Sequence, residues 1–287
     1  TDTASHYTNP RYGRGDMPMV LRSGDKEKIR QQAQGLGADL VGFLSLRDYH
    51  SPRSPDPQNW LADARSIVLL AFRQLYGAFD TDAWSHMHSY MYAPEATAIR
   101  AGYMLAKSVE DGYGGRTFMV PLHRPFEMDE DSYRMPTGIV SLRHSAVQAG
   151  LAVWGRNTLA LTPQFGPRQW FLALLTSLEV ETDPPAVGDY NPCQTCSFPC
   201  VDACPGNAFT EDGRTISHRC VRNSQGHDPG HLMRFLVELM DQPGAEERKA
   251  MLKSASFFNK LQNLHGYLNY SCIHCTRACP PLGQGSL

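Results

Sequence analysis

Eight cysteines, all within the last third of the chain, are the residues whose type and spacing could do chemistry. The segment NPCQTCSFPCVDACP (residues 191–205) has the pattern C-x2-C-x3-C-x3-C-P, and SCIHCTRACP (271–280) has the pattern C-x2-C-x3-C-P. Cys220 stands alone between them. Disulfide frameworks are typical of short secreted chains that cannot build a core, whereas this chain has 287 residues and a 41% hydrophobic composition. The thiols are therefore expected to bind zinc or iron-sulfur clusters.

The spacing of the cysteines favours iron-sulfur clusters over zinc. Bacterial ferredoxins use C-x2-C-x2-C-x3-C-P, in which three thiolates bind one cluster and the fourth binds the other. Here the first run has one extra residue before its third cysteine, and Cys220 supplies the thiol that the second run lacks. Two Cys-Pro endings without matched CxxC pairs fit zinc poorly. The pattern predicts two [4Fe-4S] clusters, one ligated by Cys193, Cys196, Cys200 and Cys279, the other by Cys220, Cys272, Cys275 and Cys204.

The elements that must position these cysteines are helices alternating with short apolar strands. The pattern predicts helices over 23–37, 93–115, 138–150, 229–240 and 245–264, and strands over 39–46, 66–73 and 116–120. Residues 157–162 and 168–180 are expected to pair as two strands around the turn PQFGP. The Pro- and Gly-containing linker ETDPPAVGDYNP separates an α/β domain, residues 1–182, from a cysteine domain, residues 183–287. The fold class expected is α+β.

The amino-acid composition does not indicate a particular binding partner. The formal net charge is −2, from 27 basic and 29 acidic residues, so the chain has no polycationic footprint for nucleic acid. We find no apolar run near the length of a membrane span and no signal-peptide pattern, so a cytoplasmic, reducing location is expected. The chain has no GxGxxG dinucleotide motif and no phosphate-binding P-loop.

The stretch HSAVQAGLAVWGRNTLALTPQFGPRQWFLALLTSLEVETDPP (144–185), with the cysteine groups and HRCVRN after it, resembles the corrinoid iron-sulfur reductases. These are the reductive dehalogenases and epoxyqueuosine reductases. The resemblance covers roughly residues 60–280 and is strongest from Gly150 to Pro205. It implies a nitroreductase-like core that binds base-off cobalamin, followed by a ferredoxin-like domain with two [4Fe-4S] clusters. A small-molecule substrate and an external electron donor (ferredoxin, flavodoxin or a reductase) are the implied partners.

The resemblance places the cobalamin contacts on one segment. A corrin ring is a flat plate fringed with amides, so glycine turns, small polar side chains and apolar faces suit it. The same residues could instead serve only turns and packing. The matching positions are Gly150, Gly155, Arg156, Asn157, Thr158, Leu159, Thr162, Phe165, Gly166 and Pro167.

The proton donor departs from the epoxyqueuosine pattern. In those enzymes an acidic donor lies in a DSAP-like segment before the glycine that aligns with Gly150, and this chain has Pro136 at that place. Reductive dehalogenases use a tyrosine phenol assisted by a basic side chain. The resemblance therefore makes Tyr92 or Tyr90 the donor and Arg143 its basic partner, with Tyr133 as the next candidate. A packed or solvated surface is the alternative role for the tyrosines.

Several functions stay open at this point. The segment TPQFGPR is closer to the dehalogenase version, which favours a reductive dehalogenase-like enzyme. The first alternative is an epoxyqueuosine reductase-like enzyme with an altered proton donor, for which tRNA would be the partner. The second is a non-catalytic corrinoid or electron-transfer protein. A two-cluster protein whose first domain holds a flavin, or only a binding cleft, is the third.

Overall fold

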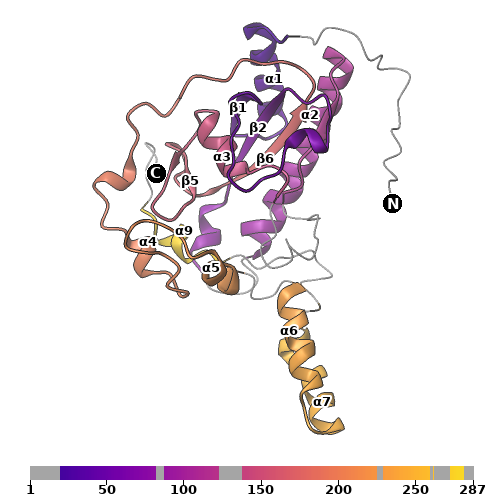
Figure 1. Ribbon diagram of the computed structural model, residues 1–287, viewed down its shortest axis with the longest axis vertical. Helices are drawn as coiled ribbons and strands as arrows, with labels where there is room; N and C mark the ends of the chain where they lie inside the picture. Colours follow the sequence, from indigo (N-terminus) through magenta and orange to yellow (C-terminus); the bar gives the residue numbers. More distant parts are fainter. Residues whose placement is uncertain are drawn as a thin grey trace.

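A computed structural model describes residues 20–81, 87–122, 138–224, 229–258, 261 and 272–280, without the side chains of 221–231. Its centre is a four-stranded antiparallel sheet in the order β1-β2-β6-β3 (Figure 1). Tyr133 and Pro136 lie outside the described residues. The strands are β1 (Leu40–Ser45), β2 (Ser66–Arg73), β3 (Thr117–Met119) and β6 (Gln169–Thr176).

Both faces of the sheet are buried, because its central strands are continuous apolar runs. Alternate residues of β2 enter two different cores: Val68 and Leu70 pack on one side, Ile67 and Leu69 on the other. Helices α1 (Ser23–Gly35) and α2 (Ala93–Tyr113) cover the first face, and α3 (Leu142–Gln148) covers the second. This two-sided burial explains why the strands lack polar alternation. The mixed α and β composition agrees with the expected class.

Helix α2 begins in an unusual way. Residues His88–Tyr92 form a π-helix, η3, that runs directly into α2 with Pro94 in its first turn. The helix ends at Gly114, whose φ of 68° is the left-handed conformation that glycine adopts readily. π-helical turns are rare and occur often at functional sites. This turn carries both Tyr90 and Tyr92.

The expected strand pair around PQFGP is wrong. Strand β5 (Ala160–Leu161) pairs with β4 (Val153–Trp154), whereas β6 pairs with β2 and β3. Strand β2 pairs along the whole of β6, and β3 pairs with its last three residues, whereas the partner of β5 is β4. A single bridge, Thr162 with Gly166, and the side chain of Gln169, which donates to Ala160 O at 2.9 Å, connect the two segments instead.

The cysteine elements lie together at one end of the molecule, and a helical hairpin projects beyond them (Figure 1). The helix expected over 245–264 ends at Leu252, because Ser254 starts a new turn by accepting the Phe257 N–H at 3.2 Å. In the described part of the chain, no helix is both long and apolar enough to cross a membrane. The elements are η4 (Pro192–Gln194), α4 (Pro199–Asp202), α5 (Ser217–Ser224), α9 (His274–Ala278) and the hairpin α6 (Pro229–Met240) and α7 (Ala245–Leu252).

The linker between sheet and cysteines is tied to the core at its beginning. Asp183 accepts the Phe43 N–H at 3.0 Å and forms ion pairs with Lys26 and Arg30. Farther along, Ala186 N donates to Gly150 O at 2.9 Å. These contacts fix where the chain leaves the sheet toward η4. The domain boundary at residue 183 remains a prediction.

Candidate metal centre

The eight thiols fall into two groups, and the first draws on both cysteine motifs. The pKa of Cys279 is raised to about 11, first by burial and then by the thiols of Cys200, Cys193 and Cys196, against a lowering by Arg168. Burial also raises the pKa of Cys200, with Cys193 and Cys196 as the next causes. These four side chains are therefore electrostatic neighbours, although Cys279 is far from the others in sequence.

The second group is assembled in the same way. The pKa of Cys275 is raised to about 12; burial is the largest cause, and the thiols of Cys272 and Cys220 are the next. The pKa of Cys220 is raised by burial and then by Cys272 and Cys204. The thiol of Cys200, from the first group, also raises the pKa of Cys275, although less strongly. The two groups therefore adjoin. Helices α4 and α9, which carry one cysteine motif each, pack against one another.

None of the eight thiols forms a disulfide. Backbone N–H groups point at three of the sulfurs: Phe198 N donates to Cys196 Sγ at 3.4 Å, and Ala208 N donates to Cys204 Sγ at 3.4 Å. The third donor is Arg156 N, 3.3 Å from Cys193 Sγ. Such donors favour ionised sulfur. Among the described residues, no three His, Cys, Asp or Glu side chains form a site for a single metal ion.

Arg156 connects the sheet domain to the first cysteine motif. Its guanidinium donates to Thr210 O at 2.7 Å and to Glu211 O at 2.9 Å, and it lies over the Phe198 ring, 5.5 Å from the centroid. Together with its N–H on Cys193, this makes Arg156 a clamp between the β4–β5 turn and the cysteine elements.

Arg168 holds the second motif in a similar way. It is 7% exposed, and its guanidinium donates to Cys279 O at 2.6 Å and Arg277 O at 3.3 Å. Burial lowers the pKa of Arg168, while the Cys279 thiol raises it. Arg277 in turn donates to Thr81 O at 2.6 Å. These contacts attach the end of α9 to the sheet domain.

Replacing Arg168 by methionine is expected to lower the free energy of unfolding by about 2–3 kcal/mol, because the buried carbonyls lose a charged donor. Chemical denaturation of both variants measures this, with Arg100→Met on the exposed side of α2 as the matched control. Equal stability of Arg168→Met and the parent protein would show that these hydrogen bonds do not stabilise the attachment of α9 to the sheet domain.

The predicted cobalamin residues lie in two turns on either side of β5. Gly150 packs on the linker instead: a Cβ there would lie 2.7 Å from Pro185 Cα, which explains its glycine at a φ of 71°. Gly155 N donates to Leu159 O at 2.9 Å, closing the first turn. The second turn, which holds Phe165, Gly166 and Pro167, is closed by Thr162.

Two side chains in these turns, Arg156 at Nε and Asn157 at Nδ2, have a buried nitrogen without a hydrogen-bond partner among the described residues. Asn157 is 4% exposed; its Oδ1 accepts the Leu159 N–H at 3.2 Å, but its Nδ2 has no partner among the residues that the structure describes. A buried amide of this kind is suited to a carbonyl of a ligand. Thr158 has a φ of 57°, and its Oγ1 accepts a hydrogen bond from Thr215 Oγ1 at 3.1 Å.

Arg143 lies near the second thiol group. Its guanidinium donates to Thr158 O at 2.7 Å. Burial lowers the pKa of Arg143, and the Cys220 thiol opposes this shift. The predicted residue is thus placed between α3, the β4–β5 turn and α5.

The structure separates the two candidate tyrosines. Tyr90 is 6% exposed and makes edge contacts with Phe79 and Trp170 in a small core that also contains Ile273 of the second cysteine motif. Tyr92 is 43% exposed, and its ring centroid lies 5.2 Å from that of the exposed His88. Of the two, only Tyr92 is exposed to solvent.

Sequence reasoning missed two titratable groups. Burial raises the pKa of Glu95, in the first turn of α2, although a carboxylate at a helix start is ordinarily favoured. Burial also raises the pKa of Tyr190 to about 12, with Cys279 and Cys193 as the next causes. The sequence has no signal for either, because burial is a tertiary property.

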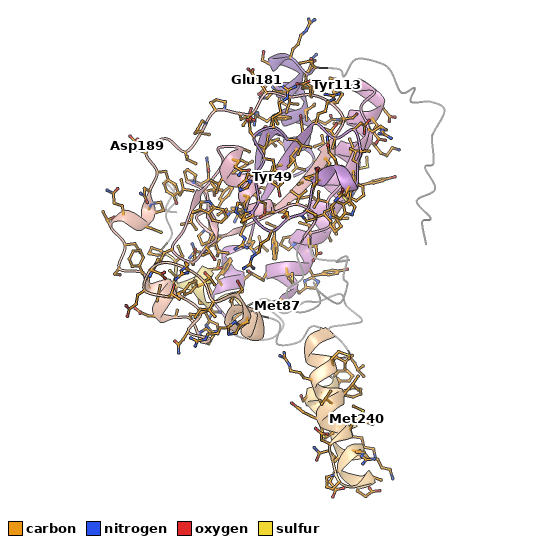
Figure 2. All side chains as sticks on the ribbon, in the orientation of Figure 1. Tyr49, Met87, Tyr113, Glu181, Asp189 and Met240 are labelled. Atoms are coloured by element: carbon orange, nitrogen blue, oxygen red, sulfur yellow. The ribbon has the colours of Figure 1, made fainter. Side chains whose placement is uncertain are left out.

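A separate cavity of about 440 Å³ lies at the other end of the sheet, near the end of β1 and the start of β2. Tyr49, one of its lining residues, is labelled in Figure 2. None of the predicted site residues in the described part of the chain lines it. It is not part of the thiol site. Other lining residues include Arg47, His50, Asp56, Arg65 and Glu179.

The fold and this site define a mixed α and β protein with two adjoining groups of four thiols beside an antiparallel sheet. No protein-family model matches the chain. It is 38% identical over 229 residues to an epoxyqueuosine reductase of Lactococcus garvieae (strain Lg2), covering 68% of this chain and 59% of the relative. It is 34% identical over 135 residues to a tetrachloroethene reductive dehalogenase of Dehalobacter restrictus (strain DSM 9455 / PER-K23), covering 47% and 21%.

Solved structures of both kinds share the fold. A reductive dehalogenase whose structure suggests a mechanism for B12-dependent dehalogenation superposes with a TM-score of 0.54 at 18% identity, over 89% of this chain and 39% of its own. Epoxyqueuosine reductases superpose with TM-scores of 0.52 to 0.56. The homologues and structural neighbours of both kinds support the corrinoid iron-sulfur reductase family for this chain. The chain spans 59% of the Lactococcus relative and 21% of the Dehalobacter relative.

Proposed function

We propose that this chain is a cobalamin-dependent iron-sulfur reductase, in which two [4Fe-4S] clusters pass electrons to a base-off corrinoid that reduces a small organic substrate. The observation that carries the proposal is the grouping of the thiols. Each group of four takes its members from both cysteine regions, as two interlocked ferredoxin clusters require. An external electron donor such as a ferredoxin or flavodoxin would supply the first electron.

The thiol groups fit cubane clusters chemically. In a [4Fe-4S] cluster each thiolate binds a different iron, so four ligands surround a cluster and need not meet at one ion. Buried, crowded thiols resist ionisation, and a bound metal provides the positive charge that removes their protons. The N–H donors on Cys193, Cys196 and Cys204 would stabilise the charged sulfurs.

We assign the corrinoid to the region of the β4–β5 turn and the second thiol group. Asn157, with its buried unpaired amide, and Arg143, beside Cys220, are the residues we assign to it. Arg156 and Gly150 instead serve to join the cysteine elements and linker to the sheet domain. When bound, the corrinoid would supply the reducing metal, while the protein binds, orients and shields it.

We assign the proton donor to Tyr92, with His88 as its basic neighbour. Both side chains are exposed on the π-helical turn, whereas Tyr90 is packed in a core. A phenol O–H can donate its proton as charge builds on the substrate. Glu95, three residues further on and with a raised pKa, is the second acid to test.

Metal analysis tests the proposal first. Anaerobically prepared protein is expected to contain about eight irons per chain, four for each cubane. Stoichiometric zinc with little iron would contradict it. After reconstitution with cobalamin, sharp corrin bands should appear beside the broad iron-sulfur absorption. Iron-sulfur absorption alone would instead favour an electron-transfer protein without a corrinoid.

The two kinds of relative give two candidate substrate classes. Pro136 stands where epoxyqueuosine reductases have their acidic donor, which favours a dehalogenase-like reaction. The 38% identity to the Lactococcus epoxyqueuosine reductase favours an epoxide substrate instead. Turnover with a chemical reductant separates them, using a halogenated arene or alkene in one assay and an epoxyqueuosine-containing tRNA stem loop in the other. We expect reduction of the halogenated substrate.

A further inference from the structure

Tyr190 lies directly before the first cysteine motif. It follows Asp189, which Figure 2 labels on the segment that leads from the sheet toward α4. The phenol oxygen of Tyr190 is buried, and within the described residues it has no hydrogen-bond partner. A buried hydroxyl that makes no hydrogen bond costs on the order of 1–3 kcal/mol. A group of this kind therefore points to a ligand that accepts its hydrogen.

The thiols around Tyr190 identify that ligand. After burial, the largest causes that raise its pKa are the thiols of Cys279 and Cys193. These two cysteines come from opposite motifs and belong to the same thiol group. The phenol thus faces the place where the two motifs meet. A phenol O–H is a hydrogen-bond donor that a thiolate or sulfide sulfur can accept.

We propose that Tyr190 donates its O–H to a sulfur of the first cluster, the one ligated by Cys193, Cys196, Cys200 and Cys279, and thereby raises its reduction potential. The inference rests on the iron-sulfur function proposed above. Reduction adds negative charge to a cluster, and a hydrogen bond to sulfur stabilises the reduced form more than the oxidised form. Two backbone donors already serve Cys193 and Cys196, and the phenol adds a side-chain donor.

The test is a redox titration of the full chain carrying both clusters, followed by electron paramagnetic resonance. Tyr190→Phe removes one oxygen and keeps the ring. We expect the one-electron equilibrium of the first cluster to change about tenfold toward the oxidised form, a fall of about 59 mV, with the second cluster unchanged. The signal of the first cluster is the one that Cys279→Ala lacks. Tyr113→Phe, a partly buried tyrosine at the end of α2 (Figure 2), is the control.

A second measurement reports the hydrogen bond itself. In the parent protein exchanged into D2O, an exchangeable proton coupled to the first cluster should be visible by electron-nuclear double resonance. That coupling should be missing from Tyr190→Phe. Should Tyr190→Phe fail to load the first cluster, 3-fluorotyrosine at position 190 replaces it: the stronger donor is expected to raise the potential.

The outcomes separate the inference from the proposed function. Protein without iron would overturn the proposed function. Two loaded clusters with the same first-cluster potential in the parent and in the Tyr190 variant would overturn the inference alone. An equal shift of both clusters would also overturn it, because it would reveal a general structural effect.

Discussion

Replacing Cys220 by alanine is expected to remove one cluster and leave the other, so that iron falls from about eight to about four per chain. The reason is the partition of the thiols. Cys220 is grouped with Cys272, Cys204 and Cys275, and it contributes nothing to the pKa of Cys279. Iron analysis together with spin quantification of the reduced protein measures the loss.

The reciprocal variant makes the test sharp. Cys279→Ala should remove the other cluster, although Cys279 lies only four residues after Cys275 in the same motif. Two variants that lose the same cluster would contradict the interlocked arrangement and favour one cluster for each motif. We expect that a cubane lacking one thiolate ligand fails to assemble, so either variant should lose about four irons rather than one.

Replacing Tyr92 by phenylalanine is expected to lower turnover of the reducible substrate by about two to four orders of magnitude, the usual effect of a positioned acid. The variant should retain both clusters and the corrinoid, because Tyr92 is exposed on η3 and lies outside both thiol groups. Turnover with a chemical reductant, alongside iron content and the visible spectrum, distinguishes loss of chemistry from loss of cofactor.

Two controls bracket this experiment. Tyr103→Phe, also exposed but on α2, should turn over like the parent protein. Tyr90→Phe keeps the ring that contacts Phe79 and Trp170 and removes only its hydroxyl, so we expect little change in turnover. If Tyr90→Phe loses activity and Tyr92→Phe does not, the donor is the buried tyrosine. If neither loses activity, Glu95→Gln is the next variant.

Much of the sheet domain could be predicted from local pattern. Strands β1 and β2 and the strand part of 168–180 are continuous apolar runs, and such runs form strands that are buried on both faces. Helix α2 has Pro94 in its first turn and a glycine at its end, the signals that predicted its bounds. The pairing of the strands could not be predicted in this way. Strand β5 pairs with β4, and β6 pairs with β2 and β3, but no local signal determines which distant segments come together.

The site divides in the same way. The spacing of the thiols is characteristic of a ferredoxin motif, so the sequence alone predicts which eight residues would hold clusters and how the two clusters would share them. Only the tertiary structure decided the rest. It placed Tyr90 in a core and Tyr92 at the surface, turned Arg156 and Arg168 into clamps, and brought the phenol of Tyr190 against thiols from both motifs. Burial and approach between distant segments set these roles, and neither property is written in the spacing of neighbouring residues.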